Sequence, residues 1–152
     1  MKRKKEAGQA LVLVVVALLL ILLPIMGLGI DFGYFRYQQV QLQTAADAAA
    51  IAAAGEHSYG VTSSCNAVQA AGRSASAANG FANGANGVTV NVNNPPQSAQ
   101  DSNSGNASYV EVVIAQNQPT FFVRILGINS VALVARAEAM QSSKSGNGVL
   151  VE

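Results

Sequence analysis

The chain has 152 residues, of which half are hydrophobic and only 11% are charged, so it has room for one small domain with an appendage. Its formal net charge of +1 includes four adjacent cations at positions 2–5, and the remaining basic residues are scattered, which argues against nucleic-acid binding. Cys65 is the only cysteine, so neither an internal disulfide nor a cysteine-based zinc site can form.

Residues 9–30 form an uncharged run of 22 mostly apolar residues. A helix of this length spans roughly 33 Å, which matches a hydrocarbon core of about 30 Å. We therefore expect a transmembrane helix over 9–30, preceded by a basic cytoplasmic segment over 1–8. A cleaved secretory signal is the alternative, but its apolar region is normally shorter and ends at an A-x-A-like site, which is missing here. The N-terminal cations predict a cytoplasmic N-terminus and an extracytoplasmic domain.

An Ala-rich helix is expected to continue from this span over residues 31–55. Residues 38–54 contain no glycine or proline and consist mainly of Ala and Gln, which favour helix. Gly33 predicts a soft joint with the span, and Gly55 predicts the end of the helix. Small residues such as Ala49 and Ala53 would let the helices of neighbouring subunits approach closely. The alternative is that one alanine face packs on the chain's own sheet.

Residues 56–140 are expected to form a small extracytoplasmic α+β domain. Ser63 and Ser64 are typical of a helix N-cap, which predicts a second helix from Cys65 to Asn79 that is closed by Gly80. Apolar residues alternate over 88–92 and 109–115 and again from Val131 to Ala137, which predicts three strands. A short helix from Pro119 to Leu126 would end at Gly127, and the tail over 141–152 is expected to be flexible.

The alternation also predicts which face of each strand is buried. Val110, Val112 and Ile114 share one face of the second strand, so Glu111 is expected to face solvent and to tolerate a change of charge. In the third strand, Arg136 and Glu138 are expected opposite the apolar face. Together the elements predict an α+β fold with a long N-terminal hydrophobic helix, a second helix and a three-stranded antiparallel sheet covered by helices on one face.

No catalytic, cofactor-binding or metal-ligating residues emerge from the sequence. Asp101 opens a segment similar to the start of a calcium loop, but an EF-hand would need Gly and Glu where Asn106 and Val112 stand. His57 is the only histidine, and a catalytic dyad would require Cys65 or a serine to be held against it. We therefore expect a protein without enzymatic activity, cofactor or metal.

Three motifs occur in order along the N-terminal third. They are Gly8-Gln-Ala-Leu-Val-Leu13 before the apolar run, Gly29-Ile-Asp-Phe-Gly33 at its end, and Leu42-Gln-Thr-Ala-Ala-Asp-Ala-Ala-Ala-Ile51. Over residues 3–55 this order resembles the TadE/TadG-like proteins of the tight-adherence (Flp) pilus-assembly system. The resemblance implies a pilin-like, membrane-anchored component whose partners are the membrane, other pilus subunits or assembly proteins, and other copies of itself.

The chain departs from related patterns in two ways. Long TadG-type proteins carry a C-terminal von Willebrand factor A domain, for which this chain has no room. Type IV prepilins have a glutamate at the fifth position after the glycine at which they are cut, whereas the fifth residue after Gly8 is Leu13.

We consider one principal function, which the resemblance implies, and two alternatives, of which the last is a different class of protein. The first is a component of an Flp-type pilus or its assembly machinery in the bacterial inner membrane, acting by helix–helix packing. The second is the main structural subunit of an extracellular filament, with residues 9–54 in the filament core. The third is a membrane-tethered surface module that binds a soluble ligand through the polar loop over 93–108.

Overall fold

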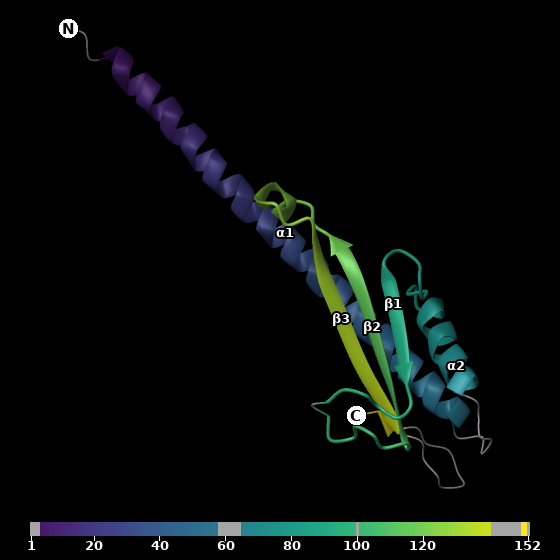
Figure 1. Cartoon of the computed structure of the whole chain (residues 1–152). Helices are drawn as coiled ribbons and strands as arrows, with labels where there is room; N and C mark the ends of the chain where they lie inside the picture. The colour runs from purple at the N-terminus through teal and green to yellow at the C-terminus, as the bar shows by residue number, and fades with distance from the viewer. Residues whose placement is uncertain (1–3, 58–64, 100, 141–149, 152) are drawn as a thin grey trace. The chain divides into compact units, whose positions relative to one another are not determined.

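The computed structural model describes residues 4–57, 65–99, 101–140 and 150–151. The chain forms two compact units. The helix–loop unit comprises Met1–Arg36 and Pro119–Val131, and the sheet unit comprises Tyr37–Gln118 and Ala132–Glu152. The elements in chain order are α1 (Lys4–His57), α2 (Cys65–Ala78), β1 (Val88–Asn93), β2 (Tyr109–Pro119), the 3₁₀ helix η1 (Val123–Leu126), β3 (Ser130–Met140) and β4 (Leu150–Val151) (Figure 1).

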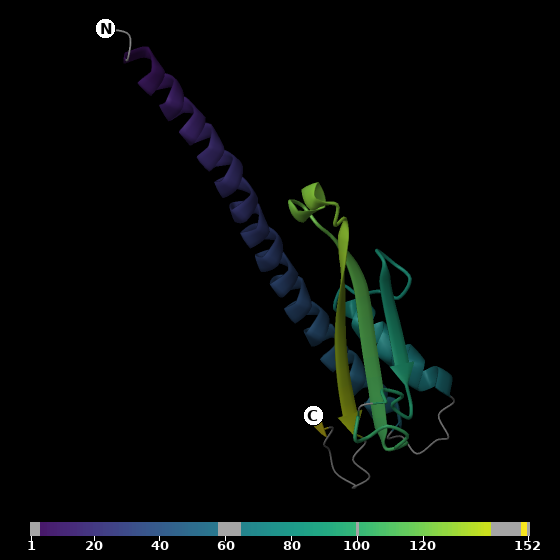
Figure 2. The same ribbon diagram turned by 60° about the vertical axis from the view of Figure 1, so that its left-hand side comes forward.

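The predicted α+β architecture is confirmed. The sheet has the strand order β1-β2-β3-β4. β1 and β2 are antiparallel, with Val90 opposite Ile114 and Val92 opposite Val112, and the two-residue β4 pairs antiparallel with the end of β3. In the sheet unit, α2 and the C-terminal part of α1 lie on the same face of the sheet (Figures 1 and 2).

Helix α1 is continuous from Lys4 to His57. The joint predicted at Gly33 and the end predicted at Gly55 are therefore wrong, and the helix also continues through Pro24. A single glycine costs a helix only about 1 kcal/mol, and Gly55 is flanked by the strong helix formers Ala54 and Glu56. Proline is likewise tolerated where neighbouring groups satisfy the backbone of an apolar helix.

The core of the sheet unit is built on the alanine face of α1. Seven residues of this face are fully buried, namely Leu42, Ala45, Ala46, Ala49, Ala50, Ala53 and Ala54. They pack with valines and an isoleucine from α2, β1 and β2 and with alanines from β3. A Cβ atom on Gly72 of α2 would lie 2.8 Å from Val92 Cγ2, so glycine permits close contact between α2 and β1 at this point.

The end of α2 confirms the predicted role of Gly80. Gly80 has φ +91°, and its N–H donates to Ala77 O at 3.0 Å, while the N–H of Phe81 donates to Ser76 O at 3.0 Å. These two bonds form a Schellman motif, which satisfies the last carbonyls of the helix. The predicted cap at Ser63 and Ser64 lies outside the described residues.

The segment between β2 and β3 differs from its prediction. β2 extends to Pro119, beyond the predicted end at Ala115, and only Val123–Leu126 form a helical turn. Gly127 ends this turn as predicted, with φ +86° and an N–H that donates to Arg124 O. The tail expected to be flexible lies outside the described residues except for β4.

Candidate functional site: a loop held by the N-terminal helix

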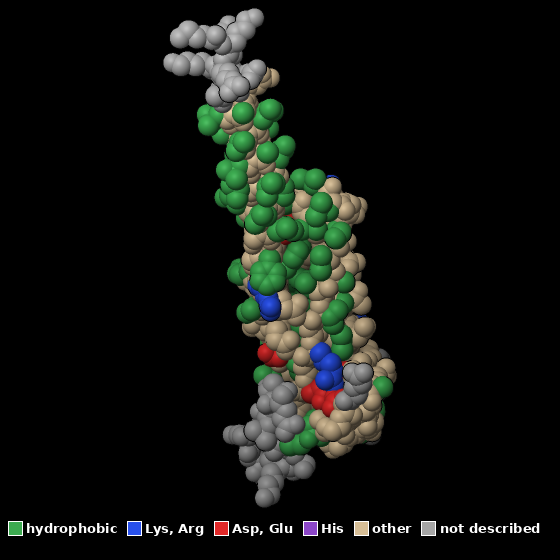
Figure 3. Space-filling view, turned by 90° about the vertical axis from the view of Figure 1, so that its left-hand side faces the viewer, with side chains coloured by type: hydrophobic (Ala, Val, Ile, Leu, Met, Phe, Trp, Pro, Cys, Tyr) green, Lys and Arg blue, Asp and Glu red, His purple; other side chains and the backbone are tan. Residues whose placement is uncertain are grey.

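The first half of α1 presents an almost unbroken apolar surface. Its large side chains from Leu11 to Ile30 are exposed, and only 6% of its most apolar 18-residue window is buried. By length and composition, α1 is able to cross a membrane. On the face shown in Figure 3, hydrophobic side chains cover this part of the helix.

Two residues of this region, Gly27 and Asp31, are buried because the loop over 119–131 lies against them. A Cβ atom on Gly27 would lie 2.6 Å from Cγ of Phe122. Glycine therefore allows the aromatic ring to contact the helix backbone directly. Any larger residue at position 27 would push the loop away from the helix.

Asp31 holds the loop through its carboxylate. Its oxygens accept backbone N–H groups from Phe121 at 3.2 Å, Phe122 at 2.9 Å and Val123 at 2.8 Å, and its side chain is 1% exposed. These N–H groups lie at the start of η1, whose own N-cap residue, Phe122, makes no side-chain cap hydrogen bond. Asp31 thus supplies the cap from about 90 residues away along the chain.

A third residue of α1 completes the contact. The ring of Tyr34 meets that of Phe121 edge to face, with centroids 5.3 Å apart. Gly27, Asp31 and Tyr34 follow the spacing i, i+4, i+7 and so share one helix face. We call these three residues the docking stripe. The loop is closed on itself by Thr120, whose hydroxyl donates to Ile128 O and whose N–H donates to Asn129 O.

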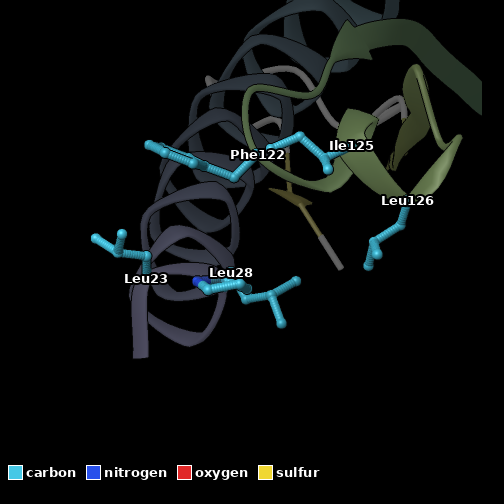
Figure 4. Close-up of a pocket in the computed structure, with 6 residues that line it drawn as sticks. Leu23, Leu28, Phe122, Ile125 and Leu126 are labelled. Atoms are coloured by element: carbon cyan, nitrogen blue, oxygen red, sulfur yellow. The ribbon is translucent and has the colours of Figure 1, made fainter. Parts of the chain in front are cut away.

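The docked loop exposes a group of large apolar side chains, which we call the apolar tip: Phe121, Phe122, Ile125, Leu126 and Ile128. Ile125 is 82% exposed and Leu126 is 71% exposed. Three tip residues, Phe122, Ile125 and Leu126, line a groove of about 320 Å³ together with Leu23, Pro24 and Leu28 of α1 (Figure 4). The groove has almost entirely apolar walls, contributed by both the helix and the loop.

In the sheet unit, three acidic side chains form a cluster around Arg136. Its Nε donates to Glu111 Oε1 at 2.5 Å, and its Nη2 bonds both Asp101 and Glu138. Glu111 is 0% exposed, so the prediction that it faces solvent is wrong. Glu138 is also buried on this face. The face opposite the alanine core is covered here by the loop over 93–108, which the alternation pattern of a single strand does not reveal.

Glu111 joins this loop to the sheet. It accepts hydrogen bonds from Asn93 Nδ2 at 2.9 Å, from the N–H of Gln97 at 3.0 Å and from the Ser98 hydroxyl. Burial alone would raise the pKa of Glu111, but the hydrogen bonds from Ser98, Arg136 and their neighbours outweigh it and lower the pKa to about 2. Glu111 is therefore a structural carboxylate that stays ionised near neutral pH.

Asp101 and Glu138 share the remaining side of the guanidinium. Hydrogen bonding with Glu138 and from the N–H of Asn103 lowers the pKa of Asp101 to about 2, whereas burial and the proximity of Asp101 raise the pKa of Glu138. Asp101, which the sequence singled out for its likeness to a calcium ligand, is thus paired with Arg136. Within the described ranges, no group of three or more His, Cys, Asp or Glu side chains is arranged to hold a metal ion. The side chains of His57 and Cys65 lie outside the described residues.

The burial of α1 also decides between the two interpretations of its alanines. Ala49 and Ala53 are both 0% exposed in the chain's own core, so they are not free to contact a neighbouring subunit. The exposed face of this part of α1 carries Tyr37, Val40, Thr44 and Ile51, spaced 3, 4 and 7 residues apart. We call these four residues the outer stripe. Its first three residues line a shallow groove of about 310 Å³ with Gln41 and Asn79.

Sequence reasoning missed the docking stripe and the apolar tip. Two signals were present. Asp31 is a lone carboxylate directly after an uncharged run, and six large apolar residues are concentrated between Phe121 and Ile128 in a segment that joins two strands. Their partnership across the chain is not encoded in any local pattern.

The single long apolar helix fits a membrane-anchored protein with a small α+β domain. The Tad family model, described as "Putative Flp pilus-assembly TadE/G-like", matches residues 8–56, which confirms the resemblance seen in the sequence. The match covers nearly all of α1, including the docking stripe and the outer stripe, and it supports involvement in Flp pilus assembly in a structural role. Comparisons with curated proteins and with solved structures found no match.

Proposed function

We propose that the chain is a pilin-like component of a tight-adherence (Flp-type) pilus or of its assembly machinery, anchored in the bacterial inner membrane. The observation that carries this proposal is that the family match over 8–56 coincides with α1, whose apolar first half the chain leaves uncovered. A lipid bilayer would cover this surface, as water would not.

The proposed topology follows from the distribution of charge. Residues 1–8 hold the basic cluster and would remain in the cytoplasm, and 9–30 would span the membrane. The helix over 31–55, the domain over 56–140 and the tail over 141–152 would lie outside the cytoplasm. In this layout the sheet unit is presented to other extracytoplasmic proteins.

The outer stripe is the surface that we propose for packing against other subunits. The alanine face of α1 is fully used by the core of the sheet unit. The outer stripe lies on the opposite side of the helix and carries the exposed apolar side chains of Val40, at 67%, and Ile51, at 41%. Apolar residues at helical spacing on an exposed face are the pattern by which one helix packs against another.

This proposal is tested in cells that lack the chain and are complemented with variants. The double variant Val40→Glu, Ile51→Glu places two charges on the outer stripe, and Thr89→Glu places one at an exposed position of β1 as a control. We expect the double variant to accumulate in membranes at the normal level, while the pilus protein in sheared surface material falls about tenfold or more, the effect of losing roughly 1.4 kcal/mol of contact energy. The control should shed pili normally.

The same fractions separate the alternatives. If the chain itself is abundant in sheared material, it is the main filament subunit, and if it is present only in traces, it is an accessory component. Normal pili in cells without the chain would contradict the proposal altogether and would favour a surface module that acts through the loop over 93–108. Normal pili in cells with the double variant would exclude the outer stripe as the contact surface.

A further inference from the structure

We propose that the apolar tip is a second membrane-contacting element, which enters the outer leaflet beside α1 and holds a lipid acyl chain in the groove between tip and helix. The inference rests on the proposed membrane anchoring of residues 9–30 and goes beyond it. It assigns to the loop over 119–131 a role that neither the family match, which ends at residue 56, nor the sequence pattern provides.

The apolar surface of the tip is continuous with that of the helix. The groove is lined on one side by Leu23, Pro24 and Leu28, which lie inside the expected span, and on the other by Phe122, Ile125 and Leu126 (Figure 4). If the helix residues are in lipid, the tip residues that share their groove meet the same lipid. The docking stripe fixes this arrangement, because Gly27 and Asp31 hold the loop directly against the helix.

Several backbone N–H groups of the loop are hydrogen-bonded within the protein, which also favours entry into lipid. The N–H groups of Phe121, Phe122 and Val123 donate to Asp31, and those of Ile125 and Gly127 donate to carbonyls of the same loop. Irregular backbone enters a bilayer only when its hydrogen bonds are made within the protein.

The charged residues near the tip are placed as they would be at a lipid–water boundary. Arg124 is the only charged residue from 119 to 131, and it is exposed. The long arginine side chain extends its charge towards the phosphates of lipid headgroups while its stem remains in an apolar environment. On α1, Arg36 lies over the ring of Phe32 at 5.2 Å, and Tyr34 packs on Phe121, an aromatic and cationic arrangement typical of the lipid–water boundary.

Tryptophan fluorescence tests this inference, because the chain contains no Trp. Three full-length variants each introduce one Trp at an exposed apolar position: Ile125→Trp in the tip, Leu18→Trp in the expected span, and Val134→Trp in β3 of the sheet unit. Each is reconstituted into phosphatidylcholine vesicles with or without bromine on the acyl chains. We expect brominated lipid to quench the Leu18 and Ile125 variants at least twofold and iodide to quench them little. The Val134 variant should show the reverse.

The outcomes separate the inference from the proposed function. If Leu18→Trp is quenched by brominated lipid but Ile125→Trp is quenched by iodide instead, the anchor stands and the tip inference is overturned. If neither is quenched by brominated lipid, membrane anchoring itself fails. If Ile125→Trp is shielded from both quenchers and the shielding disappears when the protein is diluted in excess lipid, the tip is covered by a second copy of the chain, which also overturns the assignment to lipid.

Discussion

The helix–loop unit exposes its large apolar side chains, whereas the sheet unit buries most of its own. In the first, the large side chains from Leu11 to Ile30 and the apolar tip are exposed, and the buried residues are Gly27, Asp31 and Thr120. In the second, the apolar residues of α1, α2 and the first three strands form a closed core. Burial of apolar surface from water explains the sheet unit, but the helix–loop unit is consistent only with an apolar solvent or partner.

In both units, the buried carboxylates are hydrogen-bonded. Asp31 is satisfied by three backbone N–H groups, and Glu111 is satisfied by Arg136 together with groups from the loop over 93–108. Among the described residues, no buried side-chain nitrogen or oxygen lacks a hydrogen bond. The two units therefore differ in the surroundings that their outer surfaces require. In both, the buried polar groups have hydrogen-bond partners.

The largest expected effect is that of a charge in the closed core. Val112 is 0% exposed and lies opposite Val92 in the sheet. Val112→Asp places an unpaired carboxylate there, and we expect it to destabilise the sheet unit by about 4 kcal/mol or more in denaturant unfolding of the full chain in detergent micelles. Thr89→Asp adds the same charge at an exposed position of β1 and should cost less than about 0.5 kcal/mol. Equal stability of the two variants would show that the core assignment is wrong.

We expect a smaller loss of stability when the ion cluster around Arg136 is broken. Glu111→Gln leaves Arg136 with Asp101 and Glu138 as its remaining partners, so we expect a loss of about 2–3 kcal/mol at pH 7. Glu56→Gln, at an exposed position of α1, is the matched control and should unfold like the unchanged chain. Urea unfolding measures both.

The same variant changes the response to acid. The pKa of Glu111 is lowered from 4.5 to about 2 in the folded chain, so its stabilising effect is complete above pH 4.5 and is lost as the pH falls towards 2. Asp101 contributes in the same direction, and Glu138, whose pKa is raised, opposes it. We expect Glu111→Gln to lose stability less steeply than the unchanged chain between pH 4.5 and 2. An unchanged slope would mean that Glu111 does not titrate as an ion-paired group.

The sequence predicted those features that depend on local pattern. Alternating residues identified β1, β2 and the buried face of Val110, Val112 and Ile114, and the length of the apolar run identified the first half of α1. Glu111 was assigned to the wrong environment because the strand pattern shows which residues share a face but not what covers that face. The loop over 93–108 covers it, through hydrogen bonds that no periodicity predicts.

The docking stripe could not be predicted for a related reason. Asp31 and the backbone of Phe122 are far apart along the chain, and a lone carboxylate after an apolar run is also what a simple membrane boundary would show. The glycines of α1 led to a different error, because they predicted breaks in a helix that is continuous. Gly33 and Gly55 were interpreted as interruptions, but the helix continues through both, because a single glycine costs it only about 1 kcal/mol.

The smallest expected effect is local to the helix–loop unit. Asp31→Asn replaces a carboxylate that accepts three N–H groups with a weaker, neutral acceptor. We expect the amides of residues 121–123 to exchange about tenfold faster in micelles, which corresponds to about 1.4 kcal/mol, with no change in the core amides of the sheet unit. Asp47→Asn, which alters a carboxylate bonded to Gln43 in the sheet unit, is the control. Equal protection of residues 121–123 in both variants would contradict the capping role of Asp31.

The contrast between the two units rests on their being built for different surroundings, and a topology fusion tests this most directly. A phosphatase that is active only outside the cytoplasm is joined after Gly55, so that residues 1–55 alone direct it. We predict high phosphatase activity in intact cells and recovery of the fusion in the membrane fraction, because the N-terminal cations would hold residues 1–8 inside and 9–30 would cross the bilayer. An inactive fusion, or an active one released from the membrane by cleavage, would contradict the account.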